Sequence, residues 1–149
     1  MKRRFIVGKL LGAALATLAS FPALGQESHG RQKTHRVVFD VSMDGEEKWE
    51  GMLRNVENVR ASLGENATQV EVVVHGKALP LLKRTNTKSV EKLRGLTKSG
   101  VRFAACENTM KKMKVTKEML LPFVTTVDAG VGELVRRQEA GWSYIKAGG

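Results

Sequence analysis

A single cysteine, Cys106, is present among the 149 residues, so no disulfide can form within the chain. It stands where the apolar run of residues 101–105 gives way to polar residues. A free cysteine serves either as a small buried hydrophobe or as a nucleophile, so packing or reactivity must explain it. Both explanations are open from the sequence.

The chain also lacks the motifs of several common sites. Its three histidines, His29, His35 and His75, do not have the spacing of zinc ligands with Cys106 or with one another, so we expect no metal site. No glycine-rich phosphate-binding loop follows the first predicted strand, and no Gly-x-Ser-x-Gly motif is present. We therefore expect no cofactor and no hydrolase chemistry of that type.

No apolar run reaches the roughly 20 residues that a membrane-spanning helix needs. The first residues instead have the pattern of a signal peptide: a basic start over residues 2–9, an apolar centre over residues 10–18, and small residues at Ala23 and Gly25. We predict cleavage near Gly25, which makes residues 1–25 a signal peptide. The export route, general secretory or twin-arginine, is open.

Export predicts a periplasmic or secreted protein with no stable membrane insertion after cleavage. Residues 26–33 are a polar segment that we expect to be flexible, and residues 34–149 are long enough for one domain with one core. Loss of the signal peptide would reduce the formal charge from +10 to +6. A charge of this size aids solubility but does not identify a partner.

The strongest basic cluster covers residues 111–117, and aromatic residues make up only 5% of the chain. A basic segment with few aromatic residues is typical of a solvated helix face rather than of a surface that binds nucleic acid. We expect no nucleic-acid partner.

Strand and helix patterns alternate along the rest of the chain. Asp44 and Asp128 are expected to cap helices, and Val131, Leu134 and Val135 share one face of the last helix. The alternation predicts a three-layer α/β domain with a mainly parallel, five-stranded sheet. The predicted strands cover residues 37–41, 70–74, 101–105, 123–127 and 142–145. Five helices are predicted: one from Asp44 to residue 63, one over residues 87–99, a short one that begins after Cys106, another short one around residues 116–121, and one from Asp128 to about residue 141.

Three candidate site residues come directly after strands of this predicted sheet. Asp44, His75 and Cys106 follow the first, second and third strands. Ligands and reactions in open parallel sheets gather beyond the carboxyl ends of the strands. We therefore expect these three residues at the same edge of the sheet.

A helix that begins after Cys106 would favour its thiolate through unpaired amides and the helix dipole. Lys111 and Lys112 would act in the same direction, and Glu107 would oppose it. The expected result is a nucleophilic sulfur at neutral pH.

Two further residues have alternative roles. His75 would orient or protonate a ligand or act as a base toward the sulfur, or it would form hydrogen bonds at the strand end. Asn108 would donate its amide to an anion or cap the helix. The sequence leaves these alternatives open.

The segment His75-Gly76 after a valine-rich strand, the segment 101–110 around Cys106, and the segment 127–134 together resemble the DsrE/DsrF-like family. The resemblance covers residues 35–146. It implies a DsrE/YchN-like fold and assembly into dimers, trimers or hexamers. It also implies that Cys106 accepts sulfane sulfur as a persulfide and passes it to a partner protein. The expected export and the lack of a second cysteine depart from the family's sulfur-relay members.

Two hypotheses follow. The first is a periplasmic, sulfurtransferase-like sulfur carrier in which Cys106 holds the sulfur or a related redox adduct, supported by His75, Asn108 and Asp44. The second is a non-catalytic homo-oligomeric module that binds a small anionic or organic ligand in a strand-end pocket.

Overall fold

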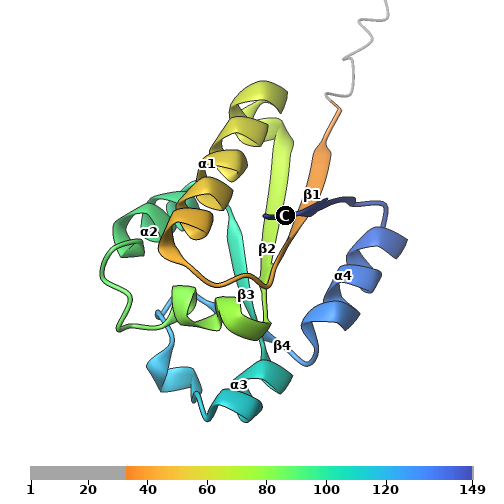
Figure 1. Ribbon diagram of the computed structural model, residues 1–149. Helices are drawn as coiled ribbons and strands as arrows, with labels where there is room; N and C mark the ends of the chain where they lie inside the picture. The colour runs from red at the N-terminus through yellow and green to blue at the C-terminus, as the bar shows by residue number, and fades with distance from the viewer. Residues whose placement is uncertain (1–32, 149) are drawn as a thin grey trace, which may run out of the picture. The chain divides into compact units, whose positions relative to one another are not determined.

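Strands alternate with helices along residues 33–148, the part of the chain that the computed structural model describes (Figure 1). The predicted signal peptide and nearly all of the predicted flexible segment lie outside the described residues. All four strand pairings are parallel, and the sheet has the order β4-β3-β2-β1-β5. The predicted parallel five-stranded sheet is therefore confirmed. The strands are β1 (His35–Val41), β2 (Thr68–Val74), β3 (Arg102–Cys106), β4 (Thr125–Val127) and β5 (Ser143–Lys146); the helices are α1 (Glu46–Leu63), α2 (Val90–Lys98), α3 (Glu107–Met113) and α4 (Gly130–Glu139), with 3₁₀ turns η1 (Glu65–Ala67), η2 (Gly76–Leu82) and η3 (Lys117–Met119).

The larger core lies on the face of the sheet that α1 and α2 cover (Figure 1). Helix α1 forms here because Trp49, Met52, Leu53 and Val56 recur at helical spacing and are all buried. On the sheet side, Phe39 and other alternate strand residues face them. Each fully buried side chain of this size contributes about 1.5–3 kcal/mol to folding. This face fixes the strands whose ends carry the candidate site.

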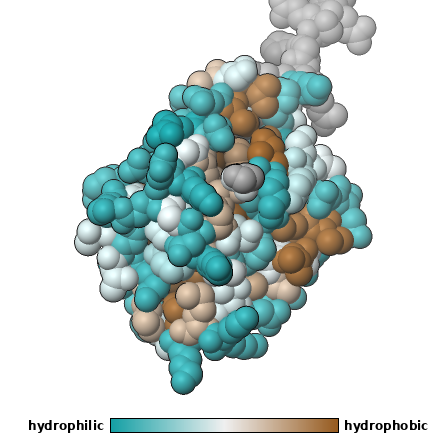
Figure 2. All heavy atoms as spheres, viewed as in Figure 1, coloured by the Kyte–Doolittle hydropathy of each residue, from teal (hydrophilic) through white to brown (hydrophobic). Residues whose placement is uncertain are grey.

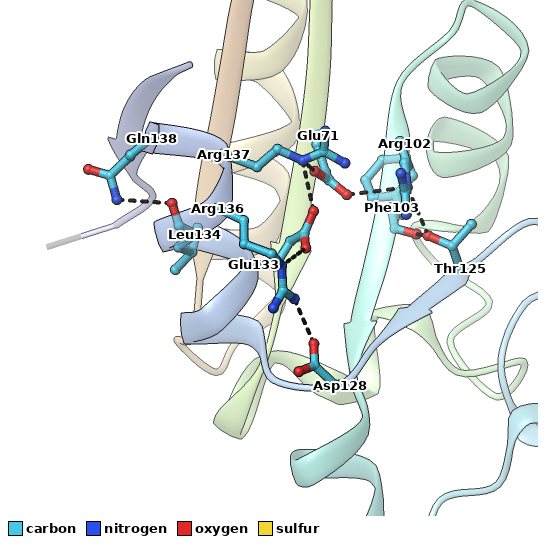
Figure 3. A network of polar contacts seen from close by, with 10 residues as sticks. All are labelled: Glu71, Arg102, Phe103, Thr125, Asp128, Glu133, Leu134, Arg136, Arg137 and Gln138. Carbon is cyan, nitrogen blue, oxygen red and sulfur yellow. Dashed lines mark hydrogen bonds and ion pairs between the residues drawn. The ribbon is translucent and has the colours of Figure 1, made fainter. Parts of the chain in front are cut away.

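The opposite face is covered by α4 and has a small apolar core of Val38, Val73 and Leu134, with Trp142 packed against it. An ion pair also joins helix α4 to the sheet. Glu71, fully buried in the middle of β2, forms ion pairs with Arg137 of α4 and with Arg102 of β3, and the Arg102 pair measures 3.2 Å (Figure 3). Burial raises the pKa of Glu71 above its ordinary value, although the pairing with Arg137 opposes this rise.

The same network extends along α4 (Figure 3). Glu133 forms ion pairs with Arg137 at 2.8 Å and with Arg136 at 3.0 Å. Arg136 also forms an ion pair with Asp128 at 2.6 Å. The guanidinium of Arg137 also lies 4.6 Å from the ring centre of Trp142, which is cation–π geometry. These contacts position α4 on the sheet and therefore position its first residue, Gly130.

Both predicted aspartate caps are wrong. Gly45, with a φ of 111°, takes the capping position of α1, and Asp44 lies exposed one residue earlier. Ala129 precedes α4 in the same way, and the Asp128 carboxylate pairs with Arg136 instead. Each aspartate stands one residue too far from its helix to accept hydrogen bonds from the first turn.

The inward face of α4 is also not the apolar one that the pattern predicted. Leu134 is buried, but Val131 and Val135 are 64% and 53% exposed. Gly130 and Glu133 share the buried side of the helix with Leu134, so the charged pairs with the sheet turn the two valines outward. Figure 2 shows a hydrophobic area in the region where Figure 1 places α4.

Most element boundaries differ from the prediction by one or two residues, and β3 ends at Cys106 rather than before it. The larger differences are in α2, β4 and the segment between α3 and β4. Helix α2 begins at Val90 rather than at 87, because the Asn86 side chain accepts a hydrogen bond from the Ser89 amide in the preceding turn. Strand β4 begins at Thr125 rather than at 123, and the predicted helix around 116–121 is only the 3₁₀ turn η3. Within residues 33–148, no helix combines the length and the apolar character that crossing a membrane requires.

Candidate functional site

The carboxyl ends of β2 and β3 bring His75 and Cys106 together. Cys106 is the last residue of β3, His75 follows β2 directly, and Val74 pairs with Ala105 in the register of the two strands. Gly130, the first residue of α4, packs against both. A Cβ built at Gly130 would lie 3.1 Å from the Cβ of His75 and 3.3 Å from the Cβ of Cys106. A larger residue at position 130 would therefore force the helix start or the strand ends to shift by a few tenths of an ångström.

Cys106 is 5% exposed and unpaired. Hydrogen-bond donors surround its sulfur: the hydroxyl of Thr109 and the main-chain N–H groups of Gly130, Thr109 and Asn108. Burial by itself raises the pKa of the thiol, but hydrogen bonding from these donors to the anion outweighs it and lowers the pKa below its ordinary value. The arrangement favours an anionic sulfur.

Helix α3 begins directly after Cys106, as the sequence predicted. Asn108 does not cap it, because Cys106 occupies the capping position and Asn108 lies inside the first turn with an exposed side chain. The contribution of Asn108 to the site is its main-chain N–H rather than its amide side chain.

The acid that meets His75 is Asp40, not Asp44. The Nε2 atom of His75 lies 2.7 Å from Oδ1 of Asp40. Asp44 makes no hydrogen bond or ion pair with His75 or Cys106, although all three residues are described by the structure. The structure therefore does not bring Asp44 together with His75 and Cys106, and its side chain is exposed in the loop after β1.

Asp40 has three donors. Besides His75, the Tyr144 hydroxyl donates to Oδ2 at 2.7 Å, and the Lys146 ammonium donates to Oδ2 at 3.0 Å. Burial raises the pKa of Asp40, but the hydrogen bonds from Tyr144, His75 and Lys146 lower it overall. The carboxylate is therefore ionised at neutral pH. Because an ionised carboxylate can only accept, Nε2 of His75 carries the proton, and this orients the ring.

The same contact acts on the phenol. The hydrogen bond that Tyr144 donates to Asp40 raises the pKa of Tyr144 to about 12, and burial adds to the shift. Residues from β1, β5 and the end of β2 thus form one hydrogen-bonded group beside Cys106.

Thr109 connects the sulfur to an open cavity. Its hydroxyl oxygen accepts a hydrogen bond from the Gly76 amide at 3.0 Å. Among the donors that lower the pKa of Cys106, the hydroxyl group of Thr109 has the largest effect. A cavity of about 440 Å³ opens beside this contact, lined by His75, Gly76, Lys77, Thr109, Lys112 and Met113. Its size is that of a small-molecule pocket.

Four residues of this site, Asp40, Thr109, Gly130 and Tyr144, were not predicted from the sequence. Asp40 carried a signal, because an acid between Phe39 and Val41 in an apolar strand must find buried partners. The other residues gave none, since threonine, glycine and tyrosine are ordinary at those positions. No group of three or more histidine, cysteine or acidic side chains within residues 33–148 is placed to hold a metal ion.

The sequence of this chain was compared with models of known protein families. A profile of the DsrE/DsrF-like family matches residues 36–147, which is most of the chain. The chain belongs to the DsrE/DsrF-like family. Within residues 36–147 lie all of the site residues described above, including Cys106 and Asp40.

Solved structures of similar proteins agree. A protein of unknown function from Methanobacterium thermoautotrophicum is 37% identical, with a TM-score of 0.71 over 75% of this chain and 98% of that one. The ychN protein from E. coli, 15% identical, has a TM-score of 0.62 over 76% and 98% of the two chains. A conserved protein of unknown function from Bacteroides thetaiotaomicron, 14% identical, has a TM-score of 0.60 over 74% and 93%. The last two show the fold alone. No curated protein is similar enough to be a match.

Proposed function

We propose that this DsrE/DsrF-like protein carries sulfane sulfur on Cys106 and passes it to an acceptor protein. The observation that supports the proposal is the set of donors around the sulfur, from Thr109, Gly130 and Asn108, which lowers the pKa of the Cys106 thiol. The thiolate is the form that attacks a sulfane sulfur, and a persulfide formed there is itself an anion that the same donors stabilise. One thiol suffices for carriage between molecules.

His75 has a supporting role in this proposal. Its ring is fixed by Asp40 through Nε2, and Gly130 packs against both its Cβ and that of Cys106. The hydrogen bond therefore holds the ring in one orientation at the strand end next to Cys106. The buried hydrogen bond with Asp40 makes this orientation costly to change.

Intact mass measurement tests the proposal. The protein is incubated with polysulfide, freed of excess reagent and weighed, with Cys106→Ser as the control. We expect the wild-type protein to gain the mass of one or more sulfur atoms, reversibly under a thiol reductant, and the serine variant to gain nothing. A wild-type thiol that gains no sulfur and also resists alkylation would refute the proposal.

A second candidate function is the non-catalytic homo-oligomeric module. It is supported by the nearly complete burial of Cys106 and by the exposure of Val131 and Val135 on α4. The molar mass of the assembly, measured by light scattering after size exclusion, distinguishes the two functions when it is combined with the measurement of sulfur uptake by intact mass. If Val131→Asp reduces the molar mass to that of one chain while Cys106 accepts no sulfur in any assembly, the module is the better description.

We also propose that the protein works in the periplasm or outside the cell. The basic start, the apolar centre and the small residues before Gln26 support this location. Amino-terminal sequencing of the protein from a periplasmic extract tests it, with Gln26 as the expected first residue. A cytoplasmic protein that begins at Met1 would contradict it.

A further inference from the structure

The cavity beside His75 has a lining of one charge sign. Its charged residues are Lys77 and Lys112, and no carboxylate lines it. Both lysines are exposed, and neither forms an ion pair with a carboxylate in the part of the chain that the structure describes. The other walls are the ring of His75, the hydroxyl of Thr109 and the exposed Met113. The cavity is therefore electropositive.

Two of the residues that line the cavity also lie next to Cys106. Thr109 lines the cavity, accepts a hydrogen bond from the Gly76 amide and acts as a donor toward Cys106. His75 lines the same cavity and lies, with Cys106, against Gly130. A molecule in the cavity would therefore contact His75 and Thr109, the two residues that lie between the cavity and Cys106.

We propose that this cavity is an anion-binding subsite that holds the charged group of a small, anionic sulfane-sulfur donor while its sulfane sulfur reaches Cys106. This inference rests on the proposed function. The volume of about 440 Å³ accommodates a sulfonate or carboxylate group with a short organic part. Lys77 and Lys112 supply the attraction, which is electrostatic and does not need one fixed geometry.

With thiosulfate as the simplest donor, the reaction balances without another reagent. The Cys106 thiolate attacks the outer sulfur, the S–S bond of thiosulfate breaks, and its electron pair leaves with sulfite. A new S–S bond forms at Cys106, which becomes a persulfide anion. The total charge is the same before and after the step. Lys77 and Lys112 stabilise the dianion both as it arrives and as it leaves.

Alkylation of Cys106 by a charged and a neutral reagent tests the subsite without any sulfur donor. The rates with iodoacetate and with iodoacetamide are measured at one pH, and their ratio is compared between variants. Any change in the thiol pKa affects both reagents equally and cancels in the ratio. We expect the double variant Lys77→Gln with Lys112→Gln to lower the ratio about three- to tenfold at low salt, and added salt to reduce the difference.

The matched control is the double variant Lys33→Gln with Lys98→Gln, which removes the same charge from exposed lysines before β1 and at the end of α2. Its ratio should equal that of the wild-type protein. If the Lys77 and Lys112 double variant gives the control ratio, the subsite is refuted, whether or not Cys106 carries sulfur.

A second measurement decides the case in which neither reagent reaches the thiol. The Cys106→Ser variant is titrated with thiosulfate and followed by amide NMR shifts. Saturable shifts at Gly76 and Thr109, absent when Lys77 and Lys112 are replaced, support the subsite even if sulfur carriage has failed. Shifts that are absent from these amides, or that grow linearly with salt alone, overturn it.

Discussion

A methyl group at position 130 would lie 3.1 Å from the Cβ of His75 and 3.3 Å from the Cβ of Cys106. Both Cβ atoms are fixed to the ends of central strands, so neither can move aside as the end of a flexible side chain does. Overpacking of this kind costs about 1–3 kcal/mol. Alanine is favoured over glycine inside a helix by roughly 0.5–1 kcal/mol, which offsets part of the cost. We therefore expect Gly130→Ala to reduce the free energy of unfolding by about 1–2 kcal/mol.

The matched change is Gly132→Ala, two residues further along α4. There the nearest atom to an added Cβ is Nη1 of Arg136 at 3.4 Å, at the end of a long side chain. Helix propensity should then dominate, and the variant should be more stable than the wild type by up to about 1 kcal/mol. The two substitutions have the same chemistry and opposite expected signs.

Chemical denaturation followed by circular dichroism measures both free energies, and the pH dependence of alkylation measures the thiol pKa. Because the Gly130 N–H is one of the donors that lower the pKa of Cys106, displacement of the helix start should raise this pKa in Gly130→Ala only. If Gly130→Ala is as stable as Gly132→Ala and leaves the thiol pKa unchanged, the close packing of α4 on the site is not as described.

Three further changes probe the polar contacts. The hydrogen bond to Asp40 raises the pKa of Tyr144, the only tyrosine, to about 12. The midpoint of its near-ultraviolet titration should therefore lie near pH 12, and this midpoint should fall in Asp40→Asn. The hydrogen bond stabilises the fold below pH 10, and its contribution is lost as the pH rises toward 12. Thr109→Val should raise the pKa of Cys106, measured by alkylation rate against pH, whereas Thr109→Ser should not. Glu71→Gln should cost about 1.5–3 kcal/mol of unfolding free energy in urea, because it removes the buried carboxylate that Arg137 and Arg102 share and leaves Arg137 paired with Glu133 alone. A matched change at an exposed glutamate of α1 should cost almost nothing.

The order of strands and helices was predictable because the central strands β1, β2 and β3 are short apolar runs and because α1 and α2 have apolar residues at helical spacing. The positions of His75 and Cys106 at one edge of the sheet followed from the parallel topology. Helix α4 was predicted correctly as a helix but with the wrong inward face. On its buried side, Arg137 forms ion pairs with Glu71 of the sheet and with Glu133 of the same helix, and a pattern that counts only apolar residues does not register this.

The site itself was less predictable. Asp40 is 104 residues from Tyr144 in sequence, and the two meet only because β5 joins the sheet next to β1. The donors around Cys106 include the amide of Gly130, which arrives at the sulfur from another helix. Contacts of this kind depend on the packing of elements, which local sequence patterns do not encode.

Strand β5 has four residues and borders the sheet at one edge, yet two of its side chains, Tyr144 and Lys146, end on the carboxylate that orients His75. An affinity tag or fluorescent protein fused at the carboxyl terminus is therefore attached next to β5, the strand that helps to hold the imidazole of His75 in place. Fraying of this strand would remove two of the three side-chain donors to Asp40 and leave its carboxylate with His75 alone. A tag that disturbs β5 would therefore weaken the support of the histidine without touching the cysteine.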